Sequence, residues 1–284
     1  MDFNNIIWLV FLFLFLQPIL AAQYLKAIRA GKFAAIQRSR KSRLIAVIHR
    51  QEAMRFLGFP LARYIDMDDA EKVLYAIRTT PADTPLDLIL HTPGGLVIAA
   101  VQIARAIKAH PGKVTVFVPH FAMSGGTLLA LASNEIVMAP HAVLGPLDPQ
   151  LGRFPAVSIV RAVERKEKSG KDIDDETLIL SDVAEKAIRQ VRDSVERLLA
   201  RNGRNGDRAA AVAQALTEGR WTHDYPITVE QVRELGLPVS VDMPDEIFRF
   251  MSLFPQPRAQ RPSVEYVPVP YAPRDRSEHA GRQR

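Results

Sequence analysis

The sequence predicts an α/β fold with parallel strands, preceded by one apolar segment at the N-terminus. Short, largely apolar runs at 44–48, 86–90 and 114–118 have the length of buried strands. The second and third of these runs lead into turns that contain glycine, and then into segments with helical apolar spacing at 96–109 and from 125 onward. Successive strand–helix units join parallel strands through right-handed crossovers, which is the basis of the prediction.

Residues 1–22 are predicted to anchor the protein in a membrane. Ile6 to Leu16 is unbroken apolar sequence, and the stretch from Phe3 to Ala22 reaches the roughly 20 residues that a spanning helix needs. A cleaved signal peptide is the main alternative, but only Asp2 precedes the apolar run, where a signal peptide carries positive charge. An interfacial helix is the third possibility.

Residues 23–43 are predicted to form a basic helix that leaves the membrane. Between Lys26 and Arg50 there are eight basic residues and no acid. By the positive-inside rule this places the bulk of the protein in the cytoplasm, as a single-pass protein of the cell membrane. The net charge of +6 is concentrated in this stretch and in the tail, so we expect contact with the lipid surface and no binding of nucleic acid.

The remaining elements follow in order along the chain. Asp66 is predicted to cap a helix, a short strand is expected at 136–138, and a long amphipathic helix carries apolar residues from Leu180 to Leu199. Smaller helices are expected at 209–216 and 229–235. Residues 255–284 are rich in proline and arginine and are predicted to be a disordered tail.

Ser124 is the strongest candidate for a catalytic residue. It lies in Met123-Ser-Gly-Gly-Thr127, between an apolar strand and an apolar helix, in a turn of small residues that would expose its hydroxyl group. The backbone N–H of Gly125, directly after the serine, and the pair Gly94-Gly95 at the end of the neighbouring strand could hold an oxyanion. Each glycine turn alone is an ordinary connection, but the two on consecutive units favour a catalytic role.

The general base is less evident from the residues alone. A lysine such as Lys171 could accept a proton only if burial lowered its pKa, and by itself it would be taken for a surface charge. The chain has no cysteine, which excludes thiolate catalysis. The histidines considered as bases are His49, His91, His120, His141 and His223.

Several motifs in this order resemble the Clp/crotonase-fold serine peptidases, and among them the signal peptide peptidase A branch. They are Thr92-Pro-Gly-Gly95, Met123-Ser-Gly-Gly-Thr127 and Leu144-Gly-Pro-Leu147. His49-Arg-Gln-Glu52, Leu147-Asp-Pro-Gln150 and Gly219-Arg-Trp-Thr-His-Asp224 make the chain more similar still to the SDH (serine dehydrogenase proteinase) family. The resemblance extends over about residues 44 to 241.

The resemblance implies a Clp/crotonase-like domain of repeated ββα units over 44–254. It implies Ser124 as the nucleophile, Gly95 and Gly125 as oxyanion amides, and Lys171, in Lys-Ser-Gly-Lys-Asp-Ile173, as the base. The match at Lys171 is two residues shorter than the family pattern, so Lys168 is the fallback. No metal or cofactor is implied. A homo-oligomer acting on peptides or membrane-protein segments is expected.

Two other functions remain open at this stage. A catalytically silent membrane scaffold would keep the fold with an unreactive Ser124. A crotonase-like acyl-CoA enzyme would need carboxylates for proton transfer, and no suitably placed glutamate is found. The roles of Asp148, His223 and Asp224 are not decided by the sequence.

Overall fold

Five parallel strands form the main sheet, and each is added beside the one that precedes it in the chain. The computed structural model describes residues 3–50, 54–56, 59–61, 64–200 and 206–254. In spatial order the strands are β1 (Arg43–Ile48), β4 (Leu86–His91), β5 (Val114–Val118), β7 (Glu135–Met138) and β11 (Val239–Ser240). All four neighbouring pairs are parallel. The predicted α/β class is therefore confirmed.

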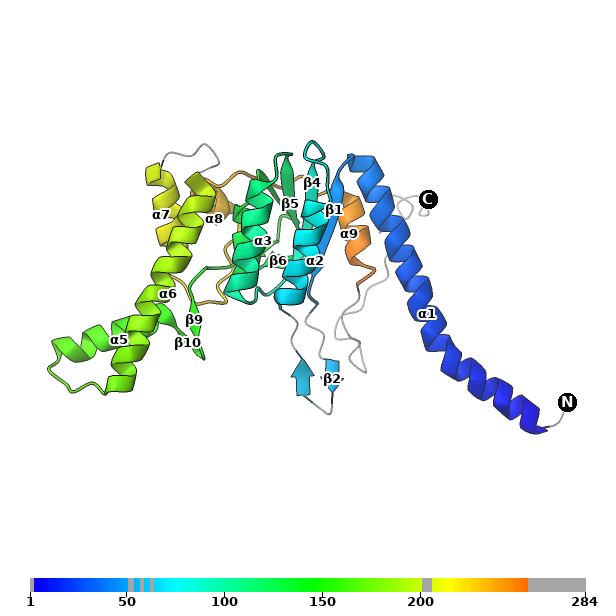
Figure 1. Cartoon of the computed structure of the whole chain (residues 1–284), viewed down its shortest axis with the longest axis horizontal. Coiled ribbons are helices and arrows are strands. Elements are labelled where there is room, and N and C mark those ends of the chain that lie inside the picture. Colours follow the sequence, from blue (N-terminus) through cyan, green and yellow to red (C-terminus); the bar gives the residue numbers. More distant parts are fainter. Residues whose placement is uncertain (1–2, 51–53, 57–58, 62–63, 201–205, 255–284) are drawn as a thin grey trace, which may run out of the picture.

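Helices cover both faces of this sheet, because alternate strand residues point to opposite sides. On one face, residues such as Leu88 and Val116 pack with α2 (Met67–Arg78), α3 (Val97–Ala109) and α4 (Gly125–Leu131). On the other face, Ile89 and Phe117 pack with the end of α1 (Phe3–Arg40) and with α9 (Asp245–Met251). Figure 1 shows the sheet between these two groups of helices.

A second, shorter layer of strands continues beyond the main sheet. β6 (Phe121–Ala122) pairs in parallel with β8 (Val143–Leu144), and isolated bridges join Thr92 to Ala122 and Ile65 to Gly95. These pairings were not predicted from the sequence, because strands of two residues carry no readable period. They bring the turn after β4 and the turn after β5 side by side, which places Gly95 next to the turn that holds Ser124.

The N-terminal helix α1 is continuous from Phe3 to Arg40, so the predicted anchor and the predicted basic helix form one rod. It contains one segment, Phe11–Arg40, that is long and apolar enough to cross a membrane. Its last turns are tied to the body by Arg29, which donates to the carbonyl of Leu253 at 2.8 Å, and by Arg40, whose Nε lies 2.5 Å from Asp87. These contacts fix the direction in which α1 extends away from the domain (Figure 1).

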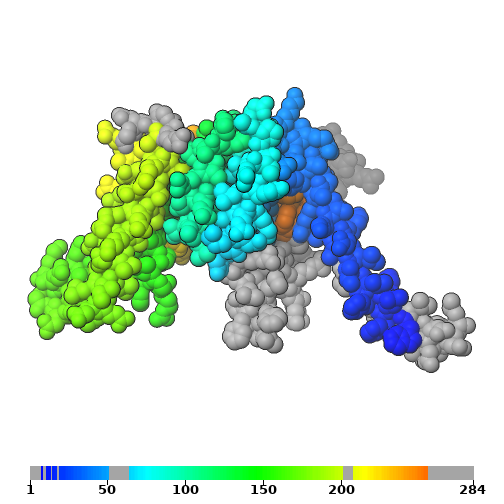
Figure 2. Space-filling view, in the orientation of Figure 1, coloured from blue at the N-terminus to red at the C-terminus, as the bar shows by residue number. Residues whose placement is uncertain are grey.

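An arm extends from the side of the body opposite α1 (Figure 2). It consists of α5 (Ala156–Lys168) packed along α6 (Asp175–Ala200), and the β9–β10 hairpin lies at its base. The predicted amphipathic helix is confirmed as α6, whereas α5 was not foreseen. The remaining elements are β2 (Met54–Phe56), β3 (Phe59–Leu61), β9 (Gln150–Leu151), β10 (Phe154–Pro155), α7 (Gly206–Thr217) and α8 (Val229–Glu234). The tail predicted at 255–284 lies outside the described residues.

Candidate active site

Ser124 occupies a strained turn between β6 and α4. Its backbone has φ 49° and ψ −117°, and Ser124 and Lys41 are the two non-glycine positions with positive φ in the described part of the chain. Such a conformation costs about 1–3 kcal/mol and persists only where the surroundings enforce it. Although Ser124 is the N-terminal cap of α4, its side chain makes no capping hydrogen bond. The hydroxyl group is thus available for other chemistry.

Two backbone amides beside Ser124 have no hydrogen-bond acceptor among the described residues. They belong to Gly95 and Gly125, whereas the amides next to them in sequence are used: Gly94 donates to Thr92 Oγ1 at 3.2 Å and Gly126 donates to the carbonyl of Met123 at 2.8 Å. A Cβ atom built on Gly125 would lie 3.5 Å from the Gly95 nitrogen, so the two amides are close together. Gly125 is buried and Gly95 is half-buried. Amides without an acceptor are rare in protein interiors, and this pair can donate hydrogen bonds to an oxyanion.

Ser124, Gly95 and Gly125 line one pocket of about 180 Å³. Apolar side chains from α3, α4 and α6 form part of its wall, among them Val97 and Leu128. The predicted nucleophile and both predicted oxyanion amides therefore meet in a single cavity. The pocket is small, and it suits one side chain or a short stretch of an extended peptide.

The same pocket contains a histidine–aspartate pair that the sequence left undecided. His223 Nδ1 lies 2.8 Å from Asp148 Oδ1, and Gln150 Nε2 donates to Asp148 Oδ2 at 2.6 Å. The Asp148 side chain is 1% exposed and that of His223 is 35% exposed. The hydrogen bond to Asp148 raises the pKa of His223 above its usual 6.5, which burial only partly opposes. The second ring nitrogen, Nε2, makes no hydrogen bond to any described residue.

Lys171, the base implied by the family resemblance, lies elsewhere. It is exposed in the turn between α5 and α6, and it is not among the residues that line the Ser124 pocket. Figure 1 shows this turn at the far end of the arm, away from β6. Lys168, at the end of α5, is exposed as well. Within one chain, neither lysine is brought to Ser124.

The other candidate histidines lie outside this pocket. His91 is buried at the end of β4 with both ring nitrogens lacking a hydrogen bond, and burial lowers its pKa to about 3, with Arg50 adding to the effect. It packs edge-on against His120, which is exposed. His141 is exposed too. Because His91 stays neutral and enclosed, it is unsuited to proton exchange with a substrate.

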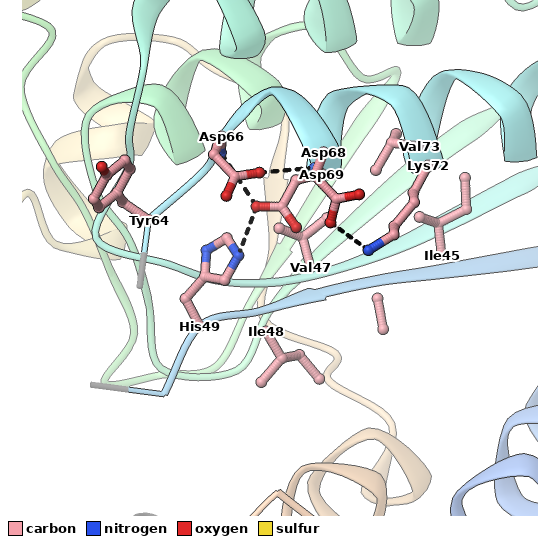
Figure 3. Close-up of a pocket in the computed structure, with 11 residues that line it drawn as sticks. Ile45, Val47, Ile48, His49, Tyr64, Asp66, Asp68, Asp69, Lys72 and Val73 are labelled. Atoms are coloured by element: carbon pink, nitrogen blue, oxygen red, sulfur yellow. Dashed lines mark hydrogen bonds and ion pairs between the residues drawn. The ribbon is translucent and has the colours of Figure 1, made fainter. Parts of the chain in front are cut away.

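His49 lies behind the glycine turn and is part of a buried polar chain. Its Nδ1 is 2.9 Å from Thr92 Oγ1 and its Nε2 is 3.1 Å from Asp69 Oδ2. Figure 3 shows Asp69 and Asp66 at the start of α2 facing His49 at the end of β1. These residues line a second, open pocket of about 600 Å³. Among the residues of known placement, no group of three or more His, Asp or Glu is arranged to hold a metal ion.

The chain is similar to known proteins over nearly its whole length. A family model described as ClpP-like SDH-type serine proteinase matches residues 2–281. Two relatives from Methanocaldococcus jannaschii are uncharacterized proteins. MJ0137 is 50% identical over 264 residues, covering 93% of this chain and 91% of its own, and MJ1495 is 45% identical over 280 residues, covering 99% and 94%. ClpP1 from Listeria monocytogenes aligns with a TM-score of 0.45 at 17% identity, covering 75% of this chain and 99% of its own.

Proposed function

Because the chain belongs to the family of ClpP-like SDH-type serine proteinases, we propose that it is a serine peptidase whose nucleophile is Ser124. The observation that carries this proposal is the cluster formed by Ser124, in its strained turn, and the unpaired amides of Gly95 and Gly125 in one pocket. A serine that only caps a helix would use its hydroxyl for the cap and would not need two free amides beside it.

The reaction needs no group from outside the chain other than water. Ser124 Oγ attacks the carbonyl carbon of the peptide bond while its proton passes to a general base. The carbonyl oxygen becomes negative and accepts hydrogen bonds from the amides of Gly95 and Gly125. The base then returns the proton to the leaving amine as the C–N bond breaks. Water attacks the acyl-enzyme by the same sequence of steps and releases the second product.

For the base we propose His223, oriented by Asp148. The Nδ1–carboxylate hydrogen bond of 2.8 Å leaves Nε2 as the nitrogen that can exchange a proton, and both residues line the pocket that contains Ser124. A buried carboxylate in this position also stabilises the imidazolium that forms during the reaction. Lys171 remains the competing prediction, and it can act on Ser124 only if a second protomer or a movement of the arm brings it there.

A fluorophosphonate probe tests the nucleophile and the base together. We expect labelling of the detergent-solubilised wild type, no labelling of Ser124→Ala, strongly slowed labelling of His223→Asn, and unchanged labelling of Lys171→Ala. His141→Asn and Lys186→Ala are matched controls, because both residues are exposed and lie outside the pocket. Slowed labelling of Lys171→Ala with normal His223→Asn would establish the lysine as the base. An unlabelled wild type of correct assembly would favour a silent scaffold.

We propose further that residues 1–22 anchor the protein in the cell membrane, with the domain from 44 to 254 in the cytoplasm. The exposed apolar side chains at the start of α1 and the basic residues that follow them support this topology. Peptides and membrane-protein segments near the bilayer are the corresponding substrates. The full chain should pellet with membranes and resist extraction at high salt, whereas a chain lacking residues 1–22 should be released.

A homo-oligomer is proposed from the surface of the arm. The first turns of α6 expose the apolar residues Leu178, Ile179 and Val183, with exposed fractions of 41%, 65% and 43%. Such a stripe is costly to leave in water, and a second copy of the chain is the partner that we expect to cover it. Replacing Ile179 by Glu should lower the mass that light scattering measures for the solubilised protein. An unchanged mass would remove this assignment.

A further inference from the structure

We propose that Asp69, His49 and Thr92 are positioning residues that hold the peptide bond between Gly94 and Gly95 in the orientation required for the oxyanion hole. This inference rests on the proposed function, because it assigns a role to the residues behind the Gly95 amide. None of the three residues touches the substrate in this proposal. They act through the glycine turn.

A continuous line of hydrogen bonds runs from the start of α2 to this turn. Asp69 Oδ2 lies 3.1 Å from His49 Nε2, and His49 Nδ1 lies 2.9 Å from Thr92 Oγ1. The Thr92 hydroxyl group accepts a hydrogen bond from the amide of Gly94 at 3.2 Å and lies 3.3 Å from the Gly94 carbonyl oxygen. Figure 3 shows the Asp69–His49 part of this line.

The same helix start anchors the turn from a second side. The amide of Ile65 donates to the carbonyl of Gly94 at 2.7 Å, and Leu96 donates back to the carbonyl of Ile65 at 2.9 Å. Ile65 directly precedes Asp66, whose amide donates to Asp69 Oδ2 at 3.2 Å. Asp69 is therefore connected to the glycine turn in two ways: through His49 to Thr92, and through the helix cap at Asp66 to Ile65.

The geometry of a trans peptide explains why these contacts matter for catalysis. In a planar trans peptide the C=O and the following N–H point in opposite directions. Holding the Gly94 carbonyl toward Ile65 and Thr92 therefore directs the Gly95 N–H to the other side, where Gly125 and Ser124 lie. Gly94 has φ +104°, so this peptide has the conformational freedom to rotate if its anchors are removed.

A direct chemical role for Thr92 is excluded by its burial. The hydroxyl group of Thr92, the imidazole of His49 and the carboxylate of Asp69 follow one another in the order of a catalytic triad. However, Thr92 is 0% exposed and His49 is 7% exposed. A substrate cannot reach the Thr92 hydroxyl group. The aspartate end is 28% exposed and faces the open pocket beside β1, so the line runs from the surface to the back of the proposed oxyanion hole.

The test measures kcat and KM for cleavage of fluorescein-labelled casein by the full-length protein, with each rate divided by the number of sites that a fluorophosphonate labels at saturation. The main variant is Thr92→Val, which removes the hydroxyl group at almost constant volume, and Thr92→Ser restores it. Asp69→Asn is paired with Asp68→Asn, because Asp68 lies on the same turn of α2 and, among the described residues, forms its ion pair with the exposed Lys72 alone. Wild type and Ser124→Ala establish in the same series that the peptidase itself is present.

We expect Thr92→Val to lower kcat by about 10- to 100-fold with KM changed by less than about twofold, because a displaced amide weakens transition-state binding and leaves substrate binding intact. Thr92→Ser and Asp68→Asn should match the wild type, and Asp69→Asn should show a smaller loss in kcat. Wild-type kcat per labelled site in Thr92→Val would overturn the proposal. If Thr92→Val does not fold, equal kcat values for Asp69→Asn and Asp68→Asn would overturn it. Absence of labelling in the wild type would remove the proposed function itself.

Discussion

Substitution of Gly95 by alanine should damage both the stability and the activity of the protein, for one steric reason. The added Cβ would lie 2.2 Å from the carbonyl oxygen and 2.4 Å from the nitrogen of Ile65. Contacts this short require a movement of about 1 Å, and both atoms belong to backbone that cannot rotate away as a side chain would. The bridge between Ile65 and Gly95 must therefore open.

The magnitude follows from what the bridge contains. Its two hydrogen bonds, from Ile65 to Gly94 and from Leu96 to Ile65, contribute about 0.5–1.5 kcal/mol each. Residual overpacking adds about 1–3 kcal/mol. We expect the free energy of unfolding to fall by about 2–6 kcal/mol. Because the Gly95 amide also leaves its position as an oxyanion donor, kcat should fall by about 10²- to 10³-fold.

Thermal unfolding and the rate of fluorophosphonate labelling measure the two effects. Gly31→Ala serves as one control, since it lies inside α1 and the new Cβ has no described atom within 4 Å beyond its chain neighbours and its own helix backbone, and it should be neutral or slightly stabilising. Gly170→Ala is the second control, because it has φ +65° but open space around it, so it isolates the cost of the backbone conformation. Wild-type stability and labelling in Gly95→Ala would refute the reasoning.

Three further predictions concern the nucleophile, its base and the attachment of α1. Because the pKa of His223 is raised, kcat/KM should increase with pH through a value above 6.5, whereas the stability that the charged pair contributes is complete below 6.5 and is lost as pH rises through the raised pKa. Asp148→Asn should shift the rise of kcat/KM to lower pH and lower kcat by about 10²- to 10⁴-fold. An unshifted pH profile would exclude His223 as the base. Ser124→Gly should be more stable than Ser124→Ala by about 1 kcal/mol in the free energy of unfolding, with a correspondingly higher unfolding temperature, because glycine relieves the strain at φ 49°. Equal stabilities of the two variants would show that the turn is unstrained. Asp87→Ala should lower the free energy of unfolding, measured by chemical denaturation, by about 2–4 kcal/mol, because the buried carboxylate accepts a hydrogen bond from Arg40 at 2.5 Å. A change below about 1 kcal/mol would contradict the role of this pair in attaching α1 to the sheet.

The predictions that succeeded from the sequence rest on local patterns. The strands at 86–90 and 114–118, the helix cap at Asp66 and the helix α6 each depend on residues that are close together in the chain. A buried parallel strand needs a continuous apolar run, and a capping aspartate needs only the next three amides. Ser124 was selected as the candidate nucleophile on the same local basis, because the strand–turn–helix that contains it is a single contiguous segment; its catalytic role stays a prediction.

The pair that we propose as the proton relay could not be found in this way. Asp148 and His223 are 75 residues apart in sequence and meet through the fold alone. The sequence leaves the roles of both residues undecided, because no local pattern indicates that they pair. Lys171 shows the opposite case. Its motif matches a family pattern, but a motif does not report the distance from the end of the arm to the pocket. The helix α5, which carries this motif away from the pocket, was not predicted, although its apolar residues Ala156, Ile159 and Val163 have helical spacing.

The sequence by itself determined the class of the fold and the apolar N-terminal helix, and it supplied Ser124, Gly95 and Gly125 as the proposed catalytic group, since all of these depend on hydrophobic period and turn chemistry within a few residues. Only the tertiary structure decided which groups surround that nucleophile. The bridge between Ile65 and Gly95, the pair formed by Asp148 and His223, and the line from Asp69 to Thr92 all join segments that are distant in the chain. Such contacts depend on which strands are neighbours in the sheet, because neighbouring parallel strands bring the loops at their ends together. The order of the strands is decided by the packing of the whole domain.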